Sequence, residues 1–311
     1  RRMSTAFGAR TTADAVLRGR DLSGQNMLVT GCNAGIGFET ARALAAHGAH
    51  VIVACRTLDK ANETSDRIRV AHPRAELSPL ALDLGSFECI RQAVSSVPVG
   101  ALHALICNAG LYMDEFEPTV EGLESTVGVC HYGHFLLTTL LVDKLRRAAP
   151  ARVVMVASES HRYPARLDLE HFPLEAHNFK ALTAYGQAKL ANVLFANELT
   201  RRYRDVGIVA NSVHPGSMIG TSIFRNSLPA KLFALAVRPF TKSIEQGAAT
   251  TVYCATASEL TNTGGQYFRD CKPHSMSRGA RDAEVAKRLW LRTQEFVEAR
   301  ETHWPASHLR S

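Results

Sequence analysis

Length, composition and charge are those of a globular protein with one large core. The chain has 311 residues, 46% of them hydrophobic, and a formal net charge of +7, which favours a single large domain. No run of five or more Lys and Arg residues and no zinc-finger or RNA-binding signature is present, so the charge predicts a solvated surface and not a nucleic-acid partner.

The cysteines and the apolar stretches indicate a cytoplasmic protein without a membrane span. The seven cysteines are odd in number and form no C-x-x-C pair, as is typical of reduced thiols. No stretch reaches the roughly 18 consecutive apolar residues of a membrane-spanning helix, and no signal-peptide core follows Arg1. Because the first residue is not Met, we expect further sequence upstream.

Short apolar runs alternate with amphipathic stretches from residue 24 onward, which predicts an α/β fold. We expect a doubly wound Rossmann-type parallel sheet of about seven strands, with helices on both faces, in a single domain. Strands are expected at 26–31, 50–55, 77–83, 101–110, 151–158, 207–216 and 264–268, and helices at 35–48, 57–71, 86–96, around Tyr185 and at 244–257. We divide the chain into a lead-in segment (1–23), the Rossmann domain (24–275) and a C-terminal helical extension (276–311), whose amphipathic helix is expected to cover the sheet edge or a substrate cleft.

The first strand leads into a glycine-rich turn that predicts a dinucleotide site. Glycines at this place let the backbone turn sharply and approach a pyrophosphate, whose charge is met by the exposed N–H groups of the following helix. In "TGCNAGIG" the expected cofactor-binding residues are Gly31, Cys32, Asn33, Gly35, Ile36 and Gly37.

Arg56 favours NADP over NAD as the cofactor. The second strand ends in "ACRT" with no carboxylate for a ribose 2′-hydroxyl, and a guanidinium can bind a 2′-phosphate with two parallel hydrogen bonds. A solvent-facing arginine is the alternative. Asp83, after the third strand, and Asn108, Ala109 and Gly110, after the fourth, are expected beside the adenosine half of the cofactor, or else they serve only their turns.

Tyr185 and Lys189 are four residues apart in "TAYGQAKLAN" and so lie on the same face of a helix. An ordinary tyrosine, with a pKa of about 10, is a poor acid near neutrality. A neighbouring ammonium stabilises the phenolate, which would make the pair a proton-transfer device. A surface pair is the alternative.

The H-x-x-H spacing of His131 and His134 is the single metal-like pattern. No acidic residue or cysteine accompanies it at ligand spacing. We expect no metal.

Taken in order, "TGCNAGIG", "NAG", "VASES", "YGQAK" and "HPG" resemble the short-chain dehydrogenase/reductase family over nearly the whole chain. The likeness is strongest to a branch in which two WW modules precede this domain and bind proline-rich tyrosine motifs; we expect those modules and their partners to lie outside this chain. A microsomal retinol dehydrogenase branch with a membrane anchor is the second candidate. The resemblance also leaves open a nuclear or mitochondrial association and a homodimer.

The resemblance implies roles for individual residues. Tyr185 would be the catalytic proton donor or acceptor, and Lys189 its electrostatic partner and a ligand of the nicotinamide ribose. Ser158 would be catalytic by binding the substrate oxygen, with Ser160 as second choice, and Pro215 and Gly216 would follow the nicotinamide. Cys130 stands where the family commonly has an asparagine that supports the lysine through water, which puts turnover in doubt because a thiol is a poor hydrogen-bonding group.

Two functions remain open. The first is an NADP-dependent enzyme acting on a lipophilic carbonyl or alcohol, steroid-like or retinoid-like, under an apolar cover formed by residues 217–240. A helix that only packs on the core is the alternative for that segment. The second is a cofactor-binding regulatory or adaptor protein with little turnover.

Overall fold

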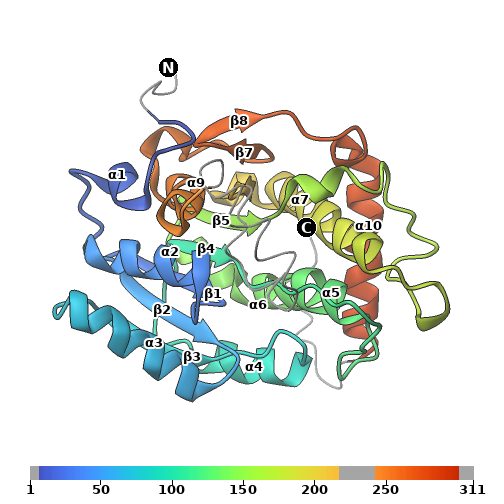
Figure 1. Ribbon diagram of the computed structural model, residues 1–311, viewed down its shortest axis with the longest axis horizontal. Helices are drawn as coiled ribbons and strands as arrows, with labels where there is room; N and C mark the ends of the chain where they lie inside the picture. Colours follow the sequence, from blue (N-terminus) through green and yellow to red (C-terminus); the bar gives the residue numbers. More distant parts are fainter. Residues whose placement is uncertain (1–6, 217–241, 301–311) are drawn as a thin grey trace, which may run out of the picture.

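A computed structural model describes residues 7–216 and 242–300. Among these residues, eight strands form one sheet in the order β3-β2-β1-β4-β5-β6-β7-β8 (Figure 1). The strands are β1 (Asn26–Thr30), β2 (His50–Cys55), β3 (Leu77–Ala81), β4 (Ala104–Cys107), β5 (Ala151–Val156), β6 (Ile208–His214), β7 (Tyr267–Arg269) and β8 (Lys272–His274). The predicted doubly wound α/β fold is confirmed.

The predicted strand count was one short. The first seven strands are parallel, and β8 pairs antiparallel with β7. The hairpin turns at Asp270 and Cys271, which have φ of 55° and 58°, as the tight turn of a two-residue hairpin requires. All three residues of β8 are exposed, so no apolar run marked the strand.

Successive residues of β1 face opposite layers of helices. Met27 and Val29 pack with α1 (Ala13–Leu17), α2 (Gly35–Ala46), α3 (Leu58–Ala71) and α9 (Ile244–Thr256). Leu28 packs in the layer formed by α4 (Phe87–Ser95), α6 (His134–Arg147), α7 (Ala181–Tyr203) and α10 (Ala283–Glu298). The shorter helical segments are α5 (Ser125–Val127), η1 (Gly128–Gly133), η2 (Glu159–Arg162), η3 (Ala176–Asn178), η4 (Arg204–Val206), η7 (Ser258–Leu260) and η8 (Gly279–Arg281).

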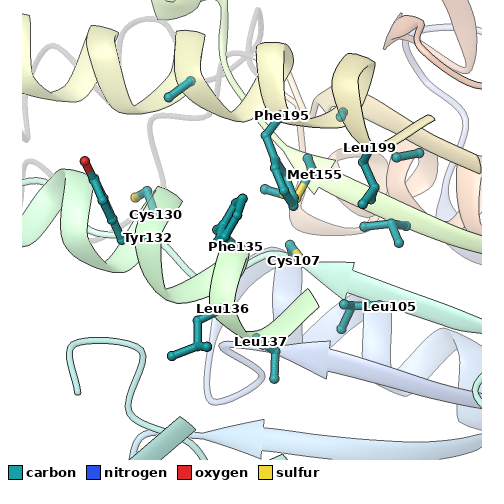
Figure 2. Packing of buried hydrophobic residues seen from close by; sticks show 14 of the residues in the cluster. Leu105, Cys107, Cys130, Tyr132, Phe135, Leu136, Leu137, Met155, Phe195 and Leu199 are labelled. Carbon is teal, nitrogen blue, oxygen red and sulfur yellow. The ribbon is translucent and has the colours of Figure 1, made fainter. Parts of the chain in front are cut away.

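Helices α6 and α7 enclose an aromatic core that α10 completes. Figure 2 shows Phe135 of α6 and Phe195 of α7 pointing into the space between the two helices, with ring centroids 5.6 Å apart. Trp290 of α10 stacks on Phe195 at 5.5 Å and meets Phe135 edge-on at 4.9 Å. The aromatic face of the C-terminal helix thus packs on α6 and α7, and its relation to a substrate cleft stays a prediction.

In the part of the chain that the structure describes, one continuous helical stretch, Ser125–Arg147, is long and apolar enough to span a membrane. It comprises α5, η1 and α6, and 83% of its apolar window is buried inside the fold. The stretch is a core helix in this structure, because its apolar side chains are already covered by protein.

Candidate active site

The glycine-rich turn after β1 is pressed against the loop after β4. Gly31 has φ of 71°, and a Cβ on it would lie 2.9 Å from Ala109 Cα. A Cβ on Gly37 would lie 2.2 Å from Gly31 O and 2.4 Å from Asn108 Nδ2. Both glycines are needed for this close approach of three chain segments. The Asn108 amide donates to Thr30 O at 2.8 Å, so its side chain shapes the turn.

The start of α2 is open and fits a phosphate group. A Cβ on Gly35 would meet nothing within 4 Å, and no side chain caps the helix at Ala34. The other described helices of at least nine residues in the same layer, α3 and α9, are capped by Thr57 and Ser243. Because the first N–H groups of a helix lack intrahelical partners, the N–H groups from Gly35 to Gly37 can bind the pyrophosphate of a dinucleotide.

The other residues of the turn differ in what they expose. Cys32 is fully buried, its thiol donates to Val29 O at 2.9 Å, and burial raises the pKa of that thiol well above its usual value. The N–H groups of Gly31 and Cys32 both donate to Ala54 O, so they are taken by β2. Asn33 is exposed and Ile36 is half-buried.

Thr30 joins the turn to the helix that carries Cys130. The Thr30 hydroxyl lies 2.9 Å from His134 Nε2, and His134 Nδ1 lies 3.0 Å from Cys130 O. Burial lowers the pKa of His134 to about 4, so the ring is neutral near pH 7. A carbonyl oxygen only accepts, so Nδ1 carries the proton and Nε2 accepts from Thr30. Thr30 Oγ1 then accepts from the N–H groups of Asn108 at 3.0 Å and Ala109 at 2.9 Å.

Arg56 and Asp83 lie at the carboxyl ends of β2 and β3, as predicted. Arg56 is exposed directly after β2. Asp83 is half-buried, and its Oδ1 accepts from Gly85 N at 2.9 Å. The carboxylate of Asp83 therefore stabilises the turn in which it lies, and its contact with adenosine stays a prediction.

Tyr185 and Lys189 face each other on α7. The Lys189 ammonium lies 5.4 Å from the centre of the Tyr185 ring, and Lys189 is buried, whereas Tyr185 is half-buried. Burial alone would lower the pKa of Lys189, but the acidic groups of Cys130 and Tyr185 beside it outweigh burial, and its pKa is raised. The lysine is therefore a positive charge held beside a phenol.

Lys189 stands where three chain segments meet. Its Nζ donates to Val156 O at the end of β5, at 3.2 Å. A Cβ on Gly110 would lie 3.2 Å from that Nζ and 3.3 Å from Cys130 Sγ. The Cys130 thiol reaches Leu111 O only at 3.9 Å, a weak hydrogen bond. The structure thus brings Gly110, Cys130 and Lys189 together, as expected of one site.

The loop after β5 packs against α7 next to Tyr185. A Cβ on Gly186 would lie 1.6 Å from Tyr163 O and 3.1 Å from Ser160 O. Ser158, half-buried, donates from its hydroxyl to Ser160 Oγ at 3.2 Å and accepts from Ser160 N at 3.2 Å. Both serine candidates therefore lie on a segment fixed against the tyrosine helix.

Pro215 and Gly216 follow β6 and are half-buried. Gly216 has φ of 107°, and a Cβ on it would lie 2.5 Å from Lys242 Cδ. Lys242 forms an ion pair of 2.5 Å with Asp270. The predicted apolar cover, residues 217–240, lies outside the described residues.

The two histidines of the H-x-x-H pattern have separate hydrogen-bond partners. His131 Nε2 lies 3.0 Å from Thr293 Oγ1, whereas His134 bonds to Thr30 and Cys130 as described above. Within residues 7–216 and 242–300, no group of three or more His, Cys, Asp or Glu side chains could hold a metal. No sequence pattern marks the contact between His134 and Thr30, because it joins residues 104 positions apart.

Comparison with known proteins defines the class. The profile of short chain dehydrogenases matches residues 25–169. The WW domain-containing oxidoreductase of Danio rerio is 46% identical over 305 residues, which cover 95% of this chain and 74% of that protein. The chain belongs to the short-chain dehydrogenase/reductase family, whose members bind a nicotinamide cofactor.

Within the family, the predicted likeness to the branch with WW modules is confirmed. Retinol dehydrogenase 12 of Mus musculus is 39% identical over 272 residues, or 86% of this chain and 85% of that protein.

Solved structures agree with the fold. An uncharacterized protein from Mycobacterium paratuberculosis has a TM-score of 0.73 and 30% identity, covering 89% of this chain and 95% of that one. Pseudomonas aeruginosa RhlG, in an active-site complex with NADP, has a TM-score of 0.62 and 25% identity, covering 80% and 95%.

Proposed function

We propose that this protein is an NADP-dependent oxidoreductase that interconverts a lipophilic carbonyl compound and its alcohol, with Tyr185 as general acid and base. The observation that carries the proposal is the buried Lys189 ammonium, 5.4 Å from the Tyr185 ring and next to Gly110 at the carboxyl end of the sheet. In open α/β sheets this end is where ligands bind.

The residues have distinct tasks in the reduction. Bound NADPH supplies a hydride to the carbonyl carbon. Tyr185 donates its proton to the carbonyl oxygen as negative charge develops there, and the Lys189 charge stabilises the phenolate that remains. Ser158 turns its hydroxyl from Ser160 to the same carbonyl oxygen and so holds the substrate beside the tyrosine.

The choice of NADP is supported by the exposed Arg56 and by the absence of a carboxylate at the end of β2. RhlG, a structural relative, binds NADP. A phosphate monoester is matched by a guanidinium and repelled by a carboxylate.

A lipophilic substrate is supported by the surface near Tyr185. Leu182, three residues before Tyr185 on α7, is 68% exposed, and Tyr163, whose carbonyl contacts Gly186, is 60% exposed. The ring of Tyr112 meets the ring of Tyr185 edge-on at 5.7 Å. Similarity to retinol dehydrogenase 12 supports the same class of substrate.

The test is reduction of a panel of lipophilic aldehydes and ketones, including retinal and steroid ketones, with NADPH. We expect Tyr185→Phe to lower kcat by about 10²- to 10⁴-fold and to leave the Kd for NADPH within about threefold, because the phenol acts on the substrate oxygen. Turnover that survives the substitution would refute the role of Tyr185.

An adaptor that binds the cofactor with little turnover is the second candidate. It is favoured by Cys130 at the position of the usual asparagine and by the likeness to WW domain-containing oxidoreductases. For such a protein, neither the wild type nor Tyr185→Phe would turn over any compound of the panel, while NADPH would still bind to both.

A further inference from the structure

A second guanidinium lies beside the glycine-rich turn. Arg67, on α3, donates from Nη1 to the backbone oxygen of Asn33 at 3.2 Å. Its Cζ lies 4.3 Å from the centre of the Phe38 ring on α2. Asn33 belongs to the turn and Phe38 to the start of the helix that follows it, so both contacts hold the Arg67 charge at the phosphate-binding segment.

The charge of Arg67 is available to an anion. The side chain is exposed, and it has no ion pair with any residue in 7–216 or 242–300. Asn33 uses one N–H of the guanidinium, which leaves the others free to donate. Arg69 on the same helix differs, because it is paired with Asp66 at 3.3 Å and with Leu77 O at 3.2 Å.

The backbone just before Arg56 is bonded to the same turn that Arg67 contacts. The N–H groups of Gly31 and Cys32 donate to Ala54 O, which ties the turn to the end of β2 just before Arg56. The carbonyl of Asn33, the next residue of the turn, binds Arg67. A 2′-phosphate carries close to two negative charges near neutral pH, more than one guanidinium balances.

We propose that Arg67 selects the cofactor together with Arg56, by donating to the 2′-phosphate of NADP. The inference rests on the proposed use of NADP. Stacking on Phe38 and the bond to Asn33 restrict the side chain in advance, so less conformational entropy is lost when the phosphate binds.

A purely structural role for Arg67 has a different signature. If Arg67 only held the turn in shape through Asn33, its loss would weaken binding of NADPH and NADH alike, because both carry the same pyrophosphate. A phosphate ligand affects NADPH alone.

The experiment measures the Kd of NADPH and of NADH by isothermal titration calorimetry for the wild-type protein and for Arg67→Leu, Arg67→Lys and Arg69→Leu. We expect Arg67→Leu to raise the Kd of NADPH about tenfold and the Kd of NADH less than about twofold. Arg67→Lys should raise the Kd of NADPH less than Arg67→Leu does, and Arg69→Leu should have the Kd values of the wild type. Urea unfolding of each variant checks that the fold is intact.

If Arg67→Leu loses the same affinity for both cofactors, or loses none for NADPH, the proposed role of Arg67 is overturned. The proposed function still stands in that case, provided that the wild-type protein binds NADPH more tightly than NADH. A wild-type protein that binds NADH as tightly as NADPH would refute the use of NADP and this inference with it.

Discussion

At the scale of single residues, Cys130 stands where the family resemblance leads us to expect an asparagine. Its thiol is fully buried, lies near the Lys189 ammonium and reaches Leu111 O at 3.9 Å, a weak hydrogen bond. The backbone oxygen of Cys130 is bound by His134. Cys130 therefore lies within the candidate site, but its thiol can contribute only weak hydrogen bonds to a proton relay.

We expect Cys130→Asn to raise the rate of carbonyl reduction by about two- to tenfold, the worth of one added hydrogen bond. The amide would donate to Leu111 O far better than the thiol does. The measurement is kcat with NADPH and the best substrate of the panel. Cys130→Ala is the matched control and should leave the rate unchanged. An unchanged or lower rate for the Asn variant, with the fold intact, would contradict this view of the site.

At the scale of elements, the contact between α7 and the loop after β5 decides whether Ser158 and Tyr185 share a site. Gly186 permits it, because any side chain there would collide with the backbone oxygen of Tyr163. The collision involves backbone atoms, so a rotamer change cannot relieve it.

Gly186→Ala is expected to separate the loop from α7 and to lower the free energy of unfolding by about 1–3 kcal/mol, as overpacking does. Reductase activity should fall more steeply, because Ser158 moves with the loop. Urea unfolding and kcat/KM are the measurements. Gly100→Ala, where a Cβ meets nothing within 4 Å, is the control and should alter neither. A stable and fully active Gly186→Ala variant would show that the contact is not needed.

The relation between α7 and α10 bears on the homodimer that the sequence left open. Trp290 of α10 stacks on Phe195, and Arg202 of α7 lies over the Trp290 ring at 4.6 Å. This part of α7 is covered within the chain, so a second copy could not use it unless α10 moved away.

At the scale of the whole molecule, much of the fold could be predicted because apolar runs and glycine turns are local signals. The seven parallel strands come from buried runs such as 50–55 and 208–214. Strand β8 could not be predicted, since its three residues are exposed and depend on pairing with β7. The packing of α10 on α6 and α7 could not be predicted either, because an amphipathic pattern shows that one face of a helix is buried without showing which element covers it.

The candidate site divides in the same way. Tyr185, Lys189 and the glycines lie in short motifs and could be predicted from spacing. The bonds of His134 to Thr30 and of Arg67 to Asn33 could not, because one spans 104 positions of the chain and the other uses a backbone oxygen that has no sequence signature.

Buried neutral histidines should make the molecule sensitive to acid. Burial lowers the pKa of His131 to about 3 and the pKa of His134 and of His214 to about 4, against about 6.5 in the unfolded chain. Between these values the unfolded state binds protons that the folded state does not. The stabilisation is complete above about pH 6.5 and is lost as the pH falls toward 4, by up to about 1.4 kcal/mol per pH unit for each histidine.

The measurement is the free energy of unfolding by urea between pH 7.5 and pH 4. His131→Leu keeps an apolar group in the aromatic cluster and removes one of the titrating groups, so the slope between about pH 6.5 and 4 should become shallower. Because both proteins have the same carboxylates, the contribution of these groups to the pH dependence cancels when the two slopes are compared. Equal slopes would mean that His131 does not contribute.

The two edge strands of the sheet limit how copies of the chain can associate. The outermost strands, β3 and β8, each contain a proline, Pro79 and Pro273, and proline has no backbone N–H to give to a neighbouring chain. Lys272 adds a charge at the β8 border. Neither edge of the sheet is therefore suited to pair with a strand of a second molecule. Crowded or newly synthesised copies should resist aggregation through their edge strands, and a stable dimer would have to form through helices or loops.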